Sequence, residues 1–302
     1  MSEVEVPKPF RLSYSATTQF LTCEKKYYVE RVMKIPRDTD SEEDATALRW
    51  GKCFHETLEA CRHRRDQYTH AMLIDAAKRN ALDPQAVWAV YASILNYLTL
   101  HEKSGLDVIT CEIEVGSVEE EVVGYIDAVM ADKNGFWWIV DLKTSGMIMN
   151  QMFPRLRNDP QLNLYASFAK DVAEKLGLNI ERFAGVRYRV VGKTKIVIKP
   201  NDTMETYAAR ANPRAMDIEI LACDMQLGTV RQIQEEMLQR IRKVRSGEIM
   251  PVPNYSKCLD FNRPCEFWSN CYGKTYTECA NMTVVFDHND MVDRTCNSDI
   301  LL

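Results

Sequence analysis

The stretch GYIDAVMADKNGFWWIVDLK, residues 124–143, decides the fold predicted for this chain. Its two halves are rich in β-branched and aromatic residues, and the polar turn KNG at 133–135 separates them. Short apolar segments joined by a turn of this kind are typical of a β-hairpin. We therefore predict consecutive strands over 121–131 and 136–143.

Three polar side chains lie on these two strands. Asp141 and Lys143 are two residues apart, so they share one face of their strand, with the carbonyl of Leu142 between them. Asp127 lies on the preceding strand and can lie beside Asp141 if the strands pair. Two close carboxylates repel each other unless a cation lies between them, and oxygen ligands suit Mg²⁺ or Mn²⁺. The alternative for Asp141 and Lys143 alone is a solvated salt bridge.

A metal ion held there would have a definite chemistry. It can polarise a phosphodiester, lower the pKa of a bound water and hold the leaving oxygen. Lys143 could then orient the attacking water or stabilise the developing negative charge.

Other polar residues on predicted helices add to this group. His55 lies on a helix expected over 45–65, and an imidazole ligand would favour Mn²⁺ over Mg²⁺. Gln161 and Tyr165 lie four residues apart on a helix expected over 160–176, so they share a face. Both can hydrogen-bond a phosphate or a base. The alternatives are an ordinary surface or core histidine and an ordinary amphipathic helix.

The rest of the chain predicts an α/β fold with a mixed central sheet flanked by helices. The N-terminal part is helical and the C-terminal segment is rich in cysteine. A strand over 108–115 precedes the hairpin, and its Glu112 and Glu114 are weaker candidates for the site, interpreted first as ordinary surface acids. Further helices are expected over 13–34, 69–80, 84–103 and 215–246, and further strands over 184–191 and 193–200.

Composition limits the partners and the compartment. The net charge of -5 means that a nucleic acid can bind only at a local basic surface. The basic clusters that could contribute to it are Lys25 and Lys26, Arg62 to Arg65, Arg155 and Arg157, and Lys193, Lys195 and Lys199. No segment is apolar and long enough to span a membrane, and the N-terminus has no secretory signal. We therefore expect a cytoplasmic protein. Its 10 cysteines then indicate metal or redox chemistry rather than disulfides.

The succession GKCFH, GYID, DLK and QLNLY resembles the RecB-type branch of the PD-(D/E)XK nuclease superfamily. These motifs cover roughly residues 51–165. The resemblance implies a restriction-endonuclease-like core and a metal site. It also implies that Lys143 is a catalytic residue. Gln161 and Tyr165 would hold DNA or support the site. The implied metal ligands are His55, Asp127, Asp141 and the carbonyl of Leu142.

The cysteines extend the resemblance. Cys258, Cys265 and Cys271 lie in CLDFNRPCEFWSNC, and Cys23 lies far upstream. This pattern resembles the iron–sulfur nucleases of the same branch, among them CRISPR-associated and phage RecB-like exonucleases. It implies that these four thiolates bind a [4Fe–4S] cluster, which would join the N-terminal helix to the C-terminal segment. Structural Zn²⁺ is the alternative, and Cys279 is a substitute ligand.

The resemblance also implies an organisation and an activity. We expect one nuclease domain over 1–279, with its core at about 45–200, and a disordered tail over 280–302. The activity implied is a metal-dependent DNA exonuclease that acts on single-stranded or duplex ends. It would serve recombination, repair or phage DNA processing in a bacterial or phage-infected cell.

Two alternative activities remain. One is a structure-specific endonuclease of the same fold, and the other is a non-cleaving DNA-binding subunit. No phosphate-binding loop of the helicase kind is present in the sequence, so unwinding would come from a helicase or recombination partner.

Overall fold

The computed structural model describes residues 12–37, 42–116, 121–146, 160–222, 227–259 and 264–273. The chain forms two compact units. One comprises residues 1–21 and 40–250, and the other comprises 22–39 and 251–302. The single domain over 1–279 stays a prediction, and the tail predicted over 280–302 lies outside the described residues.

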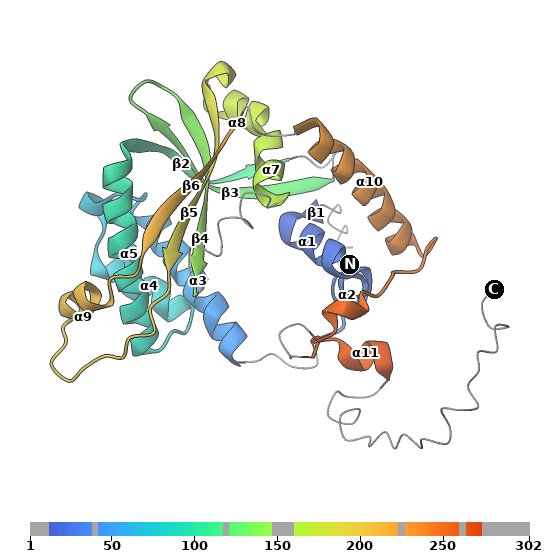
Figure 1. Ribbon diagram of the computed structural model, residues 1–302, viewed down its shortest axis with the longest axis horizontal. Coiled ribbons are helices and arrows are strands. Elements are labelled where there is room, and N and C mark those ends of the chain that lie inside the picture. The colour runs from blue at the N-terminus through green and yellow to red at the C-terminus, as the bar shows by residue number, and fades with distance from the viewer. Residues whose placement is uncertain are drawn as a thin grey trace, which may run out of the picture. The chain divides into compact units, whose positions relative to one another are not determined.

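The first unit is built on a mixed sheet with the strand order β1-β3-β4-β5-β6, in which β2 also pairs with β3 (Figure 1). Strand β3 is antiparallel to β2 and β4, whereas β5 runs parallel to β4. This arrangement confirms the predicted α/β fold with a mixed central sheet. The strands are β1 (Leu12–Ser13), β2 (Leu106–Val115), β3 (Val122–Asp132), β4 (Trp137–Ser145), β5 (Phe183–Gly192) and β6 (Ala215–Leu221).

Helices α3, α4 and α5 pack on one face of the sheet. In α3, Trp50, Phe54 and Leu58 recur every four residues, and this stripe packs into one buried cluster with Val140 and Leu142 of β4. Helix α3 therefore buries its apolar stripe against β4, the strand that carries Asp141 and Lys143. The bounds on this face are α3 (Glu42–Ala60), α4 (His70–Arg79), α5 (Pro84–Ser104) and α9 (Met204–Ala211).

Helix α5 shows how local sequence sets these bounds. The Asp83 carboxylate accepts a hydrogen bond from the Ala86 N–H at 2.9 Å, and Pro84 occupies the first turn, where its missing N–H costs nothing. Gly105 ends the helix in the left-handed conformation, with φ of 64°.

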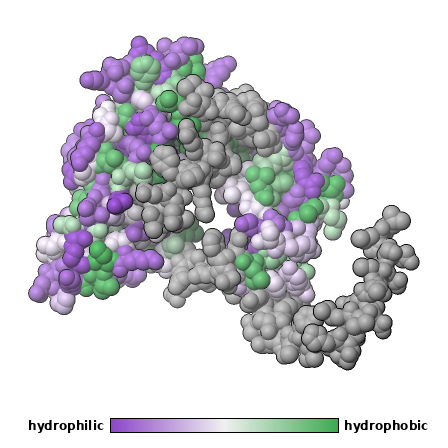
Figure 2. Space-filling view, in the orientation of Figure 1, coloured by the Kyte–Doolittle hydropathy of each residue, from purple (hydrophilic) through white to green (hydrophobic). Residues whose placement is uncertain are grey.

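Helices α7 and α10 pack against each other, and α7 also packs against β4 and β5 (Figure 1). Hydrophilic side chains cover much of the described surface in the view of Figure 2. In the described part of the chain no helix combines the length and hydropathy needed to cross a membrane. The remaining helices of this unit are α1 (Tyr14–Thr22, whose last residue falls in the second unit), α7 (Pro160–Ser167), α8 (Ala169–Leu176) and α10 (Leu227–Ser246).

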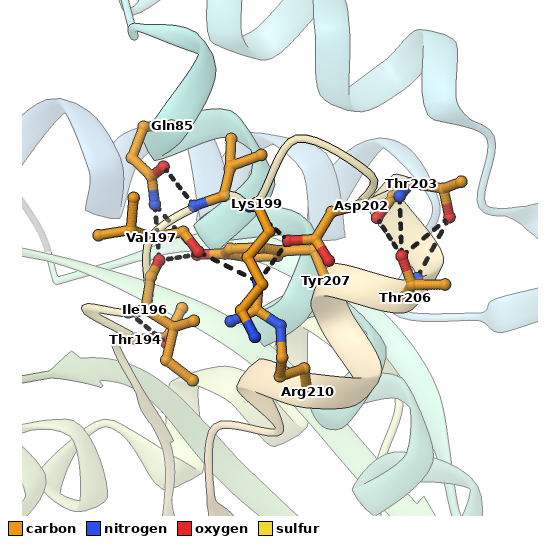
Figure 3. A network of polar contacts seen from close by, with 11 residues as sticks. Gln85, Thr194, Ile196, Val197, Lys199, Asp202, Thr203, Thr206, Tyr207 and Arg210 are labelled. Atoms are coloured by element: carbon orange, nitrogen blue, oxygen red, sulfur yellow. Dashed lines mark hydrogen bonds and ion pairs between the residues drawn. The ribbon is translucent and has the colours of Figure 1, made fainter.

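The strand predicted over 193–200 is wrong, although its alternating pattern is real. Ile196 and Ile198 pack on the core, while Val197 is 71% exposed. The Gln85 amide takes the place of a partner strand: it donates to the Ile196 carbonyl at 2.7 Å and accepts from the Ile198 N–H at 3.1 Å (Figure 3). The Tyr207 hydroxyl also donates to the Ile196 carbonyl, at 2.8 Å. Side chains of Gln85 and Tyr207 therefore make the backbone hydrogen bonds that a neighbouring strand would make in the predicted sheet.

Other predicted helices are shorter than expected. The helix predicted over 215–246 is wrong in its first part, because 215–221 form β6 and α10 begins at Leu227. Ile218 and Ile220 are buried in β6, whereas Leu221 is exposed, so the apolar period there is two. The helix predicted over 13–34 is interrupted at Cys23, which has an extended backbone. The helix predicted over 160–176 divides into α7 and α8.

The second unit joins two segments that lie far apart in the sequence. The Lys25 N–H donates to the Val252 carbonyl at 3.3 Å, and the Asn254 N–H donates to Cys23 Sγ at 3.4 Å. Lys26 also forms an ion pair with Glu266. Its buried side chains among the residues described are Tyr27, Val29, Pro251 and Phe267. Its helices are α2 (Glu24–Tyr27), a π-helical turn (Tyr28–Val32), a 3₁₀ turn (Tyr255–Lys257) and α11 (Trp268–Tyr272).

Candidate active site

The β3–β4 hairpin brings the two predicted aspartates together. Ala128 pairs with Val140, so the next step of the antiparallel register places Asp127 opposite Asp141. The Leu142 N–H donates to Asp127 Oδ2 at 2.6 Å. Asp141 is only 2% exposed, so its carboxylate lies in a site from which water is largely excluded.

A chain of polar contacts runs from Asp141 to helix α7. Lys143 Nζ lies 2.9 Å from Asp141 Oδ2 and donates to Gln161 Oε1 at 2.7 Å. The Gln161 amide donates to the Tyr165 hydroxyl at 2.8 Å, and that hydroxyl donates to the Tyr125 carbonyl at 2.7 Å. Helix α7 therefore holds the lysine ammonium beside the buried carboxylate.

The glycine of the GYID motif has a packing reason. A Cβ at Gly124 would lie 3.2 Å from Cε1 of Tyr165 and 3.1 Å from Cγ2 of Val115. Both distances are tighter than an ordinary carbon contact, so the Tyr165 ring packs directly on the β3 backbone. This close approach lets its hydroxyl reach the Tyr125 carbonyl.

A second group of ligand atoms gathers around Asp127. His55 Nδ1 lies 3.4 Å from Asp127 Oδ1. His55, Asp127 and Glu112 each offer one ligand atom, and these atoms lie within 4.8 Å of one another. Asp141 is not a member of this trio, and its Oδ2 pairs with Lys143. The carbonyl of Leu142 stays a predicted ligand.

Sequence reasoning gave Glu112 only as a weaker candidate and favoured an ordinary surface acid. Cys111 pairs with Ala128 and Ile113 pairs with Ile126, so Glu112 lies across from Asp127. Its φ is 50°, a left-handed conformation that costs a residue other than glycine roughly 1–2 kcal/mol. Strain of this kind concentrates at functional sites. The signal that could have found Glu112 is the register of the first two predicted strands.

The electrostatics of the site favour a bound cation. Burial raises the pKa of Asp141 to about 7, an effect that Lys143 opposes and Asp127 strengthens. Partial desolvation and the Asp127 carboxylate raise the pKa of Glu112 to about 7. Burial acts against the charged forms of Asp127 and His55, but their mutual hydrogen bond prevails, lowering the pKa of Asp127 and raising that of His55. Carboxylates and an imidazole form a donor set that suits Mn²⁺ or Mg²⁺.

The four predicted cluster cysteines all belong to the second unit. The Cys265 N–H donates to the Cys258 carbonyl at 2.8 Å. Cys23, Cys258, Cys265 and Cys271 are free thiols. Burial raises the pKa of Cys271, and the other three thiols add to this rise, so the four sulfurs lie close enough to interact. Cys279 lies outside the described residues.

Comparison with known proteins places this chain in a family. The sequence matches the model of the PD-(D/E)XK nuclease superfamily over residues 11–272. The chain belongs to the PD-(D/E)XK nuclease superfamily. The match also confirms the predicted restriction-endonuclease-like core. No curated protein matches the sequence.

Two solved structures are similar to this chain at low identity. One is the crystal structure of a candidate exonuclease from Eubacterium rectale, with 14% identity, a TM-score of 0.46 and coverage of 84% of this chain and 88% of that chain. Another is SSO0001, with 14% identity, a TM-score of 0.26 and coverage of 77% of this chain and 96% of that chain. At these TM-scores the similarity carries no argument about activity.

Proposed function

We propose that the chain is a divalent-metal-dependent deoxyribonuclease of the RecB-type branch that degrades DNA from its ends. One observation carries this proposal: Asp127 and Lys143 meet around the buried carboxylate of Asp141, and Gln161 bonds the lysine from α7. A solvated salt bridge at a strand end would have neither the burial nor the second carboxylate.

The residues present fit a divalent metal ion. His55, Asp127 and Asp141 would hold it, with the Leu142 carbonyl as a further ligand and Glu112 as an added donor. Two of these carboxyl groups have a raised pKa, which indicates a shortage of positive charge around them. When bound, Mg²⁺ or Mn²⁺ polarises the phosphodiester and lowers the pKa of the attacking water.

The side chains around Lys143 have separate roles in the proposed mechanism. The Lys143 ammonium stabilises negative charge that develops on the phosphate in the transition state. The Gln161 carbonyl oxygen and the Asp141 carboxylate hold Lys143 Nζ in place before substrate binds. Tyr165 fixes Gln161 by accepting from its amide. Such fixed positions avoid a reorganisation cost during the reaction.

We also propose that Cys23, Cys258, Cys265 and Cys271 hold a [4Fe–4S] cluster. Four free thiols in a unit assembled from two distant segments suit such a group. Its role is structural: it joins residues 22–39 to the C-terminal segment within one nuclease domain over 1–279. Structural Zn²⁺ is the alternative for the same four ligands, and Cys279 is a substitute ligand.

The test of the activity uses linear single-stranded and duplex DNA with one, both or neither end blocked. With Mn²⁺, we expect nucleotides to be released from free ends and DNA blocked at both ends to survive. Cleavage of doubly blocked DNA would show a structure-specific endonuclease instead. Binding without cleavage in any metal would show a DNA-binding subunit. Release of nucleotides from free ends would agree with the role that we propose, in recombination, repair or phage DNA processing. We propose that the protein acts there in the cytoplasm with a helicase partner.

Metal binding should depend on pH in a definite direction. The metal-free folded protein keeps protons on Asp141 and Glu112 up to pH of about 7, above their unfolded pKa values. Stability from these raised pKa values is therefore present at low pH and lost as pH rises through about 7. Because Mn²⁺ competes with those protons, the rise in Tm that it produces should grow between pH 6 and pH 8.

Thermal unfolding with and without Mn²⁺ measures this effect. The variant Glu112→Gln should reduce the dependence on pH, because it removes one of the two carboxyl groups. Glu114→Gln, on the same strand, is the matched control and should behave like wild type. A metal-induced shift that is equal at pH 6 and pH 8 contradicts the assignment.

A further inference from the structure

Lys193 lies at the same edge of the sheet as the candidate catalytic lysine. Its N–H donates to the carbonyl of Ser145 at 2.7 Å, and Ser145 ends β4 two residues after Lys143. Lys143 pairs with Val190 of the parallel strand β5. Lys193 therefore follows three residues beyond that pairing, roughly 10 Å further along the strand direction.

The Lys193 ammonium is held in place by contacts other than an ion pair among the residues that the structure describes. Its Nζ lies 4.9 Å from the centre of the Trp50 ring and donates to the Ala47 carbonyl at 3.1 Å. Trp50 itself is fixed by stacking on Phe54, with ring centres 5.7 Å apart. Among the described residues no carboxylate forms an ion pair with Lys193. Burial lowers the pKa of its ammonium, so its charge is partly removed from water.

Among the residues that the structure describes, this cation has no carboxylate as a counter-charge. The Ala47 carbonyl uses one of the three N–H donors of the ammonium, and the ring face compensates only part of its lost hydration. This ammonium lies beside the end of β4, the strand that carries Asp141 and Lys143, in a chain whose net charge is -5. An anion that reaches Lys143 and extends along this edge would meet Lys193 next.

We propose that Lys193 binds a second backbone phosphate of the DNA strand whose scissile phosphate lies at Lys143. This inference rests on the proposed nuclease function. The other two lysines of the segment differ: Lys195 and Lys199 are exposed, and neither has an aromatic ring beneath its ammonium among the contacts described. Of the three lysines in this segment, only Lys193 therefore has the contacts on which the proposed phosphate site rests. Lys193 acts in binding and in setting the path of the strand.

The test measures the salt dependence of DNA binding in the Asp141→Ala background, with a labelled single-stranded oligonucleotide as probe. Lys193→Met should reduce the slope of log K against log salt by about 0.7, as expected for one lost phosphate contact. It should weaken binding about 5- to 10-fold near 0.1 M salt. Lys193→Arg keeps the charge and should keep the slope. In the active enzyme, Lys193→Met should raise KM and leave kcat nearly unchanged.

Lys133→Met is the matched control, because Lys133 precedes β4 at the opposite end of the same strand. It removes the same charge and should leave the slope unchanged. Equal slopes for wild type, Lys193→Met and Lys133→Met overturn the proposal while nuclease activity stands. A wild-type protein that neither binds nor cleaves DNA overturns both. Thermal unfolding of each variant checks the fold, and Lys193→Gln replaces Lys193→Met if the latter lowers Tm.

Discussion

The variants Asp141→Ala and Lys143→Ala each lose DNA cleavage, with kcat falling about 10³-fold or more. Under the proposed function, Asp141→Ala removes a buried carboxylate that would bind the metal, and Lys143→Ala removes the ammonium that would stabilise the transition state. The two side chains contact each other directly, so their effects should not add: the double variant should be hardly worse than either single variant. Single-turnover cleavage of an end-labelled oligonucleotide with saturating Mn²⁺ measures the loss.

Controls separate chemistry from folding. Asp107→Ala and Lys133→Ala remove the same kinds of side chain from exposed positions at the far end of the sheet, and both should cleave normally. Asp141→Asn keeps the shape of the side chain and should retain the wild-type Tm more closely than Asp141→Ala. Wild-type rates in both Asp141→Ala and Lys143→Ala would contradict the site assignment. Cleavage by the variants at a higher Mn²⁺ concentration would place Asp141 in metal binding alone.

Replacement of a cluster cysteine should unfold the second unit rather than shift its stability slightly. Purified without oxygen, the wild-type protein should be brown, whereas Cys265→Ser should be colourless. Few buried apolar side chains hold this unit among the residues described, so the free energy of ligand binding would supply much of its folding energy. Limited proteolysis should therefore cut Cys265→Ser within 22–39 and after 251 while leaving the first unit resistant.

The matched control is Cys111→Ser, which changes a partly buried thiol of strand β2. It should stay brown and resist the protease as wild type does. Colourless wild-type protein with one bound zinc per chain would replace the cluster by the zinc alternative. Brown protein in the Cys271→Ser variant, lost only when Cys279 is also changed, would show that Cys279 is the fourth ligand.

Much of the hairpin and its neighbours follows from local sequence. The turn at 133–135 and the apolar run before Asp141 predict β3 and β4 to within a residue or two. Asp83, Pro84 and Gly105 set both ends of α5, because the groups that terminate a helix lie within a few residues of it. In each case the decisive interaction is made between residues close in sequence.

Other elements depend on partners that no local pattern contains. The segments at 193–200 and 215–221 both alternate, yet only 215–221 became a strand. Residues 215–221 pair with β5. The backbone of the segment at 193–200 is hydrogen-bonded instead by Gln85, which lies more than a hundred residues away in the sequence. The sequence predicts a helix over 215–221 because Ile218 and Leu221 fit the spacing of a helix as well as that of a strand. Period alone does not choose between the two when a segment is short.

The sequence by itself determined the family and the order of the polar residues: His55, Asp127, Asp141 and Lys143 with Gln161 and Tyr165. Only the tertiary structure placed Glu112 across from Asp127, bonded Lys143 to Gln161 and set Lys193 over Trp50. The physical reason is the distance along the chain over which each kind of interaction acts. Side-chain type and spacing act over one turn or one strand, whereas a ligand set is completed by strand register and helix packing, which depend on the whole core.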